Sequence, residues 1–172
     1  MRWSRLKNRT LARLATRFPA LAKIFTDSYT PRENPGDIPW VDAPVPLQQA
    51  KLALVTTAGI HHRSQQPFDM LDPDGDPSFR AIDGATLFDD FLITHDYYNH
   101  SDADRDPNII FPLDRLRELV DEKVIGSLAA THYSFMGHID GPHIDTLVQR
   151  TAVEVAERLR AAEVDLVLLT PG

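Results

Sequence analysis

The chain has 172 residues, of which 42% are hydrophobic and 25% charged, so it has the length and composition of one globular domain that can bury its own core. It contains no cysteine, which excludes disulfides, thiol catalysis and cysteine-ligated metals within these residues and fits the reducing cytoplasm, where we expect the protein to work. The net charge of -7 is unevenly distributed, because the first 26 residues hold seven Arg or Lys and no acidic residue, leaving 11 basic against 25 acidic residues in the remainder. That acidic remainder argues against a nucleic-acid partner, since phosphate contacts need clustered Lys and Arg.

Residues 1–25 are predicted to form a basic amphipathic helix. Arginines recur every three or four residues and line one ridge: Arg2, Arg5, Arg9, Arg13 and Arg17. Another face carries apolar residues: Leu11, Leu14, Ala15 and Phe18. The pattern suits contact with a membrane surface or an acidic partner, an ordinary surface helix lying on the acidic remainder or, by composition, a transit peptide. Residues 26–47 follow as a proline-rich connector.

Residues 48–172 are expected to form an α/β domain. Short apolar runs predict strands over 52–57, 91–94, 124–130 and 164–170, and helical periodicity predicts helices over 112–122 and 142–162. A long loop rich in proline and glycine is predicted over 61–90, and loops of this length are usually functional or act as lids. The alternation of strands with loops or helices predicts a mainly parallel sheet with Rossmann-like or flavodoxin-like layering, preceded by the basic helix.

Polar clusters follow three of the predicted strands, and all seven histidines lie between positions 61 and 143. Because the carboxyl ends of parallel strands share one edge of a sheet, we expect the clusters to converge there. From position alone, His95, Asp96 and His132 are expected to support catalysis by transferring protons. The residues expected to bind the substrate are His61, His100, Arg105, Asp106 and Ser134.

Metal binding is a weaker interpretation of these clusters. The aspartates within 72–76 and 102–106 begin like calcium loops, but proline stands at the sixth position of each and no glutamate at the twelfth. His95, Asp96 and His100 carry metal-ligating groups without an established ligand spacing. We therefore expect no metal site.

Six stretches of the chain occur together in a recognisable order. They are Leu54-Val55-Thr56-Thr57-Ala58-Gly59, Pro67-Phe68-Asp69, Gly75-Asp76-Pro77-Ser78-Phe79-Arg80, Ile93-Thr94-His95, Asp106-Pro107-Asn108-Ile109-Ile110-Phe111-Pro112-Leu113-Asp114-Arg115-Leu116 and Ser134-Phe135-Met136-Gly137. Together they resemble the selenoprotein B family of glycine, sarcosine, betaine and D-proline reductases. The resemblance covers roughly residues 40 to 172, with the stretches in order, and leaves the basic helix outside it.

The resemblance implies reductive cleavage of a carbon–nitrogen bond in an amino acid or betaine. In that family a selenocysteine or cysteine follows the strand that resembles residues 166–172, and its ionised selenol or thiol is the redox nucleophile. Thr170 would then lie beside the nucleophile and support it. The implied partners are a small amino-acid-like or betaine substrate and other reductase subunits or a thiol reductant.

This chain departs from the family pattern at that point, because no selenocysteine or cysteine follows Gly172. Since selenocysteine is encoded by UGA, ordinarily a stop codon, we expect the chain to be terminated at its own catalytic codon, to be incomplete at its C-terminus and to be inactive as it stands. The alternatives are a non-catalytic α/β binding or scaffold protein and a metal-assisted hydrolase. A Ser-His-Asp hydrolase acting through Ser134 or Ser101 lacks the G-x-S-x-G elbow.

Overall fold

The computed structural model describes residues 2–20, 23, 27 and 41–172, and these fall into two compact units. The first unit comprises residues 1–43 and 96–99, and the second comprises residues 44–95 and 100–172. Most of the predicted proline-rich connector, residues 28–40, lies outside the described residues. In the part of the chain that the structure describes, no helix has the length and apolar character needed to cross a membrane.

The predicted basic helix is present in the first unit as α1 (Arg2–Arg17). It holds six basic residues and no acidic residue. Arg5 forms an ion pair with Asp96, donating from Nε to one carboxylate oxygen and from Nη2 to the other. Helix α1 is therefore bonded to the 96–99 segment of its own unit.

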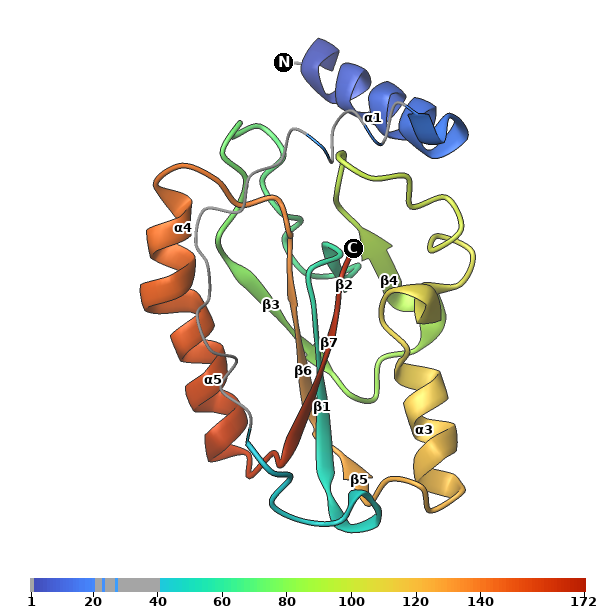
Figure 1. The fold of residues 1–172 in the computed structure, drawn as a ribbon, viewed down its shortest axis with the longest axis vertical. Coiled ribbons are helices and arrows are strands. Elements are labelled where there is room, and N and C mark those ends of the chain that lie inside the picture. The colour runs from blue at the N-terminus through green and yellow to red at the C-terminus, as the bar shows by residue number, and fades with distance from the viewer. Residues whose placement is uncertain (1, 21–22, 24–26, 28–40) are drawn as a thin grey trace. The chain divides into compact units, whose positions relative to one another are not determined.

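The second unit contains a large and a small sheet (Figure 1). The large sheet is built from β1 (Lys51–Thr56), β3 (Phe79–Asp83), β5 (Ser127–Leu128), β6 (Thr131–Phe135) and β7 (Leu166–Thr170). The small sheet pairs β2 (Ile60–His62) with β4 (Phe91–Ile93) in antiparallel fashion. The helical elements are η1 (Leu47–Gln49), η2 (Phe88–Asp90), η3 (Pro107–Ile109), α3 (Leu113–Asp121), α4 (His143–Thr146), η4 (Leu147–Thr151) and α5 (Ala152–Ala161).

Strand β1 occupies the centre of the large sheet. β7 pairs with it in parallel from Leu52 opposite Leu166 to Thr56 opposite Thr170. On the other side of β1, β5 pairs with its start and β6 with its end, both in parallel. β3 then pairs with β6 in antiparallel fashion. The prediction of an α/β fold with a mainly parallel sheet is confirmed.

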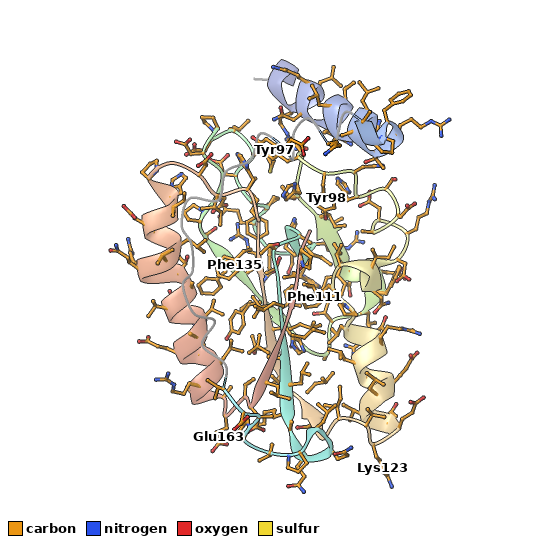
Figure 2. The ribbon with its side chains drawn as sticks, viewed as in Figure 1. Tyr97, Tyr98, Phe111, Lys123, Phe135 and Glu163 are labelled. Atoms are coloured by element: carbon orange, nitrogen blue, oxygen red, sulfur yellow. The ribbon has the colours of Figure 1, made fainter. Side chains whose placement is uncertain are left out.

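Helices cover both faces of the large sheet. Alternate residues of β6 point to opposite faces, and Tyr133 and Phe135 pack with Val155 of α5 in an apolar cluster. His132 points to the other face, where its ring meets the edge of Phe111 with 6.0 Å between centroids. Figure 1 shows α5 and α3 on opposite sides of the sheet, and Figure 2 shows Phe135 and Phe111 on the corresponding sides.

The two covering helices end where the parallel strands begin. Lys123 follows α3 with φ 60° and Glu163 follows α5 with φ 54°, the left-handed conformation that commonly ends a helix. Strands β5 and β7 start a few residues later. Figure 2 shows Lys123 and Glu163 together at one end of the sheet, where the parallel strands begin. The carboxyl ends of these strands therefore lie at the other end, toward which Figure 1 places the C-terminus.

The prediction of a strand over 124–130 is wrong in its extent. Only Ser127 and Leu128 of that range pair with β1, and the longer strand is β6, at the position where a polar cluster was predicted to follow the strand. The residues of β6 alternate between aromatic side chains and buried polar ones, so no apolar run marks the strand. The predicted loop over 61–90 likewise contains strand β3 and part of β2.

The predicted helix over 142–162 is present as a continuous run of α4, η4 and α5, in which η4 is a π-turn. In a regular α-helix the eight steps from Leu147 to Val155 would overshoot two full turns by roughly 80°. The hydrogen bonds of a π-turn span five residues and take up this excess. Leu147, Val155 and Leu159 consequently pack in the same apolar cluster.

Candidate functional site

The carboxyl ends of β1 and β7 are joined by two threonines. Thr56 and Thr170 lie opposite each other, and both hydroxyls donate to the carbonyl oxygen of Ile110, at 3.1 and 2.7 Å. The Thr57 amide donates to the Thr170 carbonyl at 3.0 Å and extends the pairing by one residue. Both strand ends are thereby fixed to each other and to the loop that precedes α3.

Beyond the strands, the backbone packs too closely for side chains at two glycines. A Cβ on Gly172 would lie 2.3 Å from the Cα of Ala58, and a Cβ on Gly59 would lie 2.6 Å from the Thr94 carbonyl oxygen. Gly59 also has a φ of +70°, which favours glycine. Its amide donates to the Phe135 carbonyl and its carbonyl accepts from the Thr94 amide, both at 2.9 Å. The ends of β4, β6 and β7 therefore meet around Ala58 and Gly59.

Two of the predicted histidines, His61 and His95, lie beside this junction. His61 is 1% exposed, its Nε2 is 2.8 Å from the Thr94 hydroxyl, and its Nδ1 is 3.0 Å from the carbonyl oxygen of His62. Because a carbonyl only accepts, Nδ1 carries the proton and Nε2 accepts from Thr94. Burial lowers the pKa of His61, so the ring is neutral near pH 7. His95 is 6% exposed, with its Cβ 3.3 Å from the place of a Cβ on Gly59.

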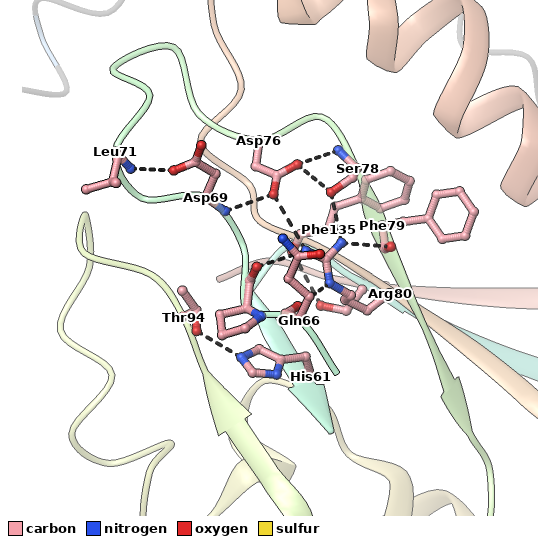
Figure 3. A network of polar contacts seen from close by, with 12 residues as sticks. His61, Gln66, Asp69, Leu71, Asp76, Ser78, Phe79, Arg80, Thr94 and Phe135 are labelled. Carbon is pink, nitrogen blue, oxygen red and sulfur yellow. Dashed lines mark hydrogen bonds and ion pairs between the residues drawn. The ribbon is translucent and has the colours of Figure 1, made fainter. Parts of the chain in front are cut away.

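Figure 3 shows the His61–Thr94 contact and, beside it, a network of polar contacts around Asp76 and Arg80. The guanidinium of Arg80 lies 4.2 Å above the ring centroid of Phe68, whose edge contacts the His61 ring at 6.2 Å between centroids. The same guanidinium lies 3.7 Å from a carboxylate oxygen of Asp76 and donates to the Ser78 hydroxyl at 2.8 Å. The side chains of Arg80 and Asp76 are 14% and 12% exposed. His61 is thus linked through the ring of Phe68 to an ion pair at the start of β3.

His132 and Ser134 lie inside the large sheet and are fully buried. Between β5 and β6 the pairing with β1 is interrupted, and there Nδ1 of His132 accepts the Leu54 amide at 2.9 Å in place of a backbone carbonyl. Among the described residues, Nε2 of His132 is a buried polar atom without a hydrogen-bond partner. Burial, and secondarily the charge of Arg117, lower the pKa of His132 to about 4. The structure thus places His132 in the backbone pairing of the sheet.

A hollow of about 350 Å³ opens beside β4. Its lining includes Arg63, Phe91 and Asp104. The guanidinium of Arg63 also donates to the Asp89 carbonyl and lies 3.7 Å from a carboxylate oxygen of Asp90. Nδ1 of His100 lies 2.9 Å from both carboxylate oxygens of Asp104, so this predicted substrate-binding residue contacts the lining of the hollow.

The other predicted substrate-binding residues lie apart from the strand ends. Arg105 has a side chain 81% exposed and pairs with Asp102 at 3.4 Å. Asp106 caps η3 by accepting the Asn108 amide at 3.0 Å. Of the predicted supporting residues, Asp96 belongs to the first unit and pairs with Arg5. Among the residues that the structure describes, no three His, Asp or Glu side chains are grouped as a metal site requires.

Sequence reasoning did not identify Thr94, Asp76 or Arg80 as site residues. All three occur in stretches that carry the family resemblance. The sequence offered one signal, the i,i+4 spacing of Asp76 and Arg80 just before a strand. The same spacing is also typical of an exposed ion pair. Their role depends on burial, which the pattern does not reveal.

The two threonines at the strand ends provide a test of this edge. Thr170→Val is expected to lower the free energy of unfolding by about 1 kcal/mol, because it removes one hydrogen bond and keeps the side-chain shape. Thr56→Val is expected to cost about 2 kcal/mol, because the Thr56 hydroxyl also accepts the Ala58 amide at 3.2 Å. The double variant is expected to cost more than the sum, because the Ile110 carbonyl loses both hydroxyls. Urea unfolding measures all three, with Thr131→Val at the half-buried start of β6 as the matched control. Strict additivity would show that the two hydroxyls do not share an acceptor.

Comparison with known proteins gives a family match over most of the chain. The model of a family described as glycine/sarcosine/betaine reductase selenoprotein B matches residues 31–172. No solved structure matches the chain.

Three curated relatives match the chain over about three quarters of its length. D-proline reductase subunit gamma of Acetoanaerobium sticklandii is 35% identical over 133 residues, which cover 77% of this chain and 53% of the relative. Glycine reductase complex component B subunit gamma of Symbiobacterium thermophilum is 30% identical over 137 residues, covering 72% and 29%. Betaine reductase complex component B subunit beta of Peptoclostridium acidaminophilum is 29% identical over 133 residues, covering 72% and 28%. The chain thus spans about half the length of the first relative and under a third of the other two.

Proposed function

The chain belongs to the glycine/sarcosine/betaine reductase selenoprotein B family, and from this premise we propose that it forms part of a reductase component that cleaves a carbon–nitrogen bond of a small amino-acid-like substrate. The substrate class comprises glycine, sarcosine, betaine and D-proline, which the names of the family and its relatives supply. The redox group in this proposal is a selenocysteine or cysteine that follows Gly172 in the complete protein.

The observation that carries the proposal is the position of the β7 end. Among the longer parallel strands the order across the sheet is β6-β1-β7, which is second, first and third along the chain. In flavodoxin-like sheets with this order, ligands bind outside the carboxyl ends of the first and third strands, where the chain reverses its direction of winding. We place the reaction centre outside β1 and β7 for that reason, and take Rossmann-like or flavodoxin-like layering as part of the proposal.

In this proposal the residues around Ala58 and Gly59 prepare the nucleophile. Gly172 lies against Ala58, and Gly59 lies against Thr94 and His95, so a residue following Gly172 starts near His95. A selenol or thiol attacks as its anion, and a neighbouring imidazole favours that form when protonated. We assign His95 to proton transfer at this group and His61 to holding Thr94 in place.

The substrate-binding side is proposed to include the hollow beside β4. Its Arg63 and Asp104 offer opposite charges for a zwitterion, and His100 contacts Asp104. His132 and Ser134 act in the proposal by shaping β6, since both are fully buried.

Reductive cleavage consumes two electrons, which a thiol reductant or another reductase subunit must supply. The relatives are named as subunits of reductases, one of a glycine and one of a betaine reductase complex, and we propose subunit partners of the same kind here. A selenol remains reduced only in a reducing compartment, so cytoplasmic work is part of the same proposal.

Selenium labelling tests the proposal. The gene, expressed from its own genomic context with radioactive selenite, is expected to yield a labelled protein longer than 172 residues. Iodoacetamide at about pH 6 is expected to alkylate that residue selectively, because a low pKa keeps the selenol ionised there. Peptide mass spectrometry then locates the modified residue.

The codon after Gly172 is the control for this experiment. A UGA followed by an open frame, or a cysteine codon, agrees with the proposal. A UAA or UAG codon with no selenium label would remove the redox group and leave a non-catalytic binding protein as the remaining interpretation.

A further inference from the structure

Helix α1 has no role in the proposed reaction, and it lies outside the residues that match the family. That match starts at residue 31, whereas α1 ends at Arg17. The helix carries six basic residues and no acidic one, while the chain beyond residue 26 has 14 more acidic than basic residues. A surface that attracts α1 by charge must therefore be anionic, and it would repel the rest of the chain.

The side chains of α1 divide into two sides. Residues three or four positions apart share a side of a helix, and Asn8, Ala12 and Ala15 form a half-buried side made of small side chains. The other side is exposed and carries large apolar residues, with Leu6 60%, Leu14 43% and Phe18 52% exposed.

A ridge of cations lies beside these apolar side chains. Arg13 and Arg17 are four positions apart and share one exposed ridge, and Leu14 and Phe18 share the next ridge, about 100° around the helix. Arg5 differs from them, because its guanidinium is bonded to Asp96 within the same unit. The exposed side thus combines large apolar groups with guanidinium groups.

We propose that α1 binds an anionic lipid surface and attaches the reductase component to it. A helix of this kind lies in the plane of the interface, with its apolar side chains at the boundary of headgroups and acyl chains. The guanidinium groups of Arg13 and Arg17 reach lipid phosphates at the same depth. An acidic protein surface would pair with the arginines of α1, but the exposed apolar side chains of Leu6, Leu14 and Phe18 would also need a matching apolar groove. A lipid interface offers both kinds of contact along the whole helix.

Vesicle sedimentation with the full 172-residue chain tests this inference. The chain is expected to bind vesicles of phosphatidylcholine with 30% phosphatidylglycerol and to stay in solution with phosphatidylcholine alone. Arg13→Gln/Arg17→Gln is expected to lower the partition coefficient about 25-fold, from about five-fold for each cation at the surface. Leu14→Ser/Phe18→Ser is expected to lower it about ten-fold or more through lost apolar burial.

The matched control is Arg150→Gln/Arg160→Gln, which removes the same charge from two exposed positions of the second unit. Its partition coefficient should stay within two-fold of the parent value. Equal losses in both arginine double variants, or no binding to the anionic vesicles, would overturn the inference. Binding to poly-L-glutamate that equals vesicle binding and is unaffected by Leu14→Ser/Phe18→Ser would overturn it as well, in favour of an acidic protein partner. None of these readouts depends on reductase activity, so failure here is distinguishable from failure of the proposed function.

Discussion

Replacing His132 with alanine is expected to lower the free energy of unfolding by about 3 kcal/mol. The imidazole accepts the Leu54 amide at the interruption between β5 and β6, and its ring is fully buried against Phe111. Alanine leaves a buried amide without an acceptor, which costs about 1–3 kcal/mol, and adds a cavity in the core. Urea unfolding at pH 7.5 measures the loss.

The same residue makes the stability depend on pH. The pKa of His132 is about 4 in the folded chain, against about 6.5 in an unfolded one. The unfolded chain therefore holds more protons between these values, so stability rises with pH across this window and is lost as the pH falls through it. The span corresponds to about 3 kcal/mol for this one group.

An asparagine variant separates the two effects. The side-chain oxygen of His132→Asn can accept the Leu54 amide but cannot titrate, so this variant should lose less stability at pH 7.5 than alanine does. Its stability between pH 6.5 and 4 should also be flatter than that of the parent chain. His62→Asn, at a partly exposed histidine, serves as the matched control. An unchanged pH slope in His132→Asn would contradict the assignment of a neutral, accepting imidazole.

Asp76→Ala is expected to destabilise the fold by about 3–5 kcal/mol. It leaves the largely buried guanidinium of Arg80 without its counter-charge. Removing one partner of a buried ion pair is strongly destabilising, because the remaining charge stays buried and uncompensated. It also removes the acceptor of the Asp69 and Ser78 amides, at 2.9 and 2.8 Å. Because the ring of Phe68 connects Arg80 to His61, the effect should extend to the site.

The pH dependence of this pair has its own window. Burial alone would raise the pKa of Asp76, but hydrogen bonds from Ser78 and Asp69 and the charge of Arg80 outweigh it and hold the pKa below its ordinary value. A lowered carboxyl pKa contributes stability that is present above about pH 4 and is lost as the pH falls through the folded value. Acid unfolding of the Asp76→Asn variant should therefore lack part of the loss seen below pH 4 in the parent.

Asp121→Asn, at an exposed position near the end of α3, is the matched control and should change stability by less than about 0.5 kcal/mol. Chemical shifts of the His61 ring provide a second measurement in a folded Asp76→Asn sample. Shifts identical to those of the parent would mean that the network does not position His61.

The sequence pattern is informative where one side of an element is apolar. β1, α3 and β7 each show an apolar run or a helical stripe, and each forms close to its predicted bounds. β6 could not be read in this way, because buried polar residues such as His132 take part in its backbone pairing and interrupt the apolar pattern. Val124 and Ile125 suggested a strand, but their amides bond to the last turn of α3.

The sequence predicts where the candidate site lies in the fold, but not which residues form it. The rule that parallel strands end at a common edge located Thr170 at the end of β7. His61 and His95 lie near the same junction for another reason, because β2 and β4 pair in the small antiparallel sheet and Thr94 bonds to Gly59. The same rule misplaced His132, because β6 begins at Thr131, just beyond the predicted strand over 124–130, and therefore includes His132. The pairing of Asp96 with Arg5 joins positions 91 residues apart, and no local pattern reveals such a contact.

The π-turn of η4 has a consequence for insertions and deletions. Deleting one residue between Leu147 and Thr151 would leave seven steps from Leu147 to Val155, and their rotation falls roughly 20° short of two α-helical turns. The regular helix made in this way would still direct both side chains to the apolar cluster that they now share. A helix with the π-turn and a helix one residue shorter without it would therefore present the same packing face, and this chain has the longer form.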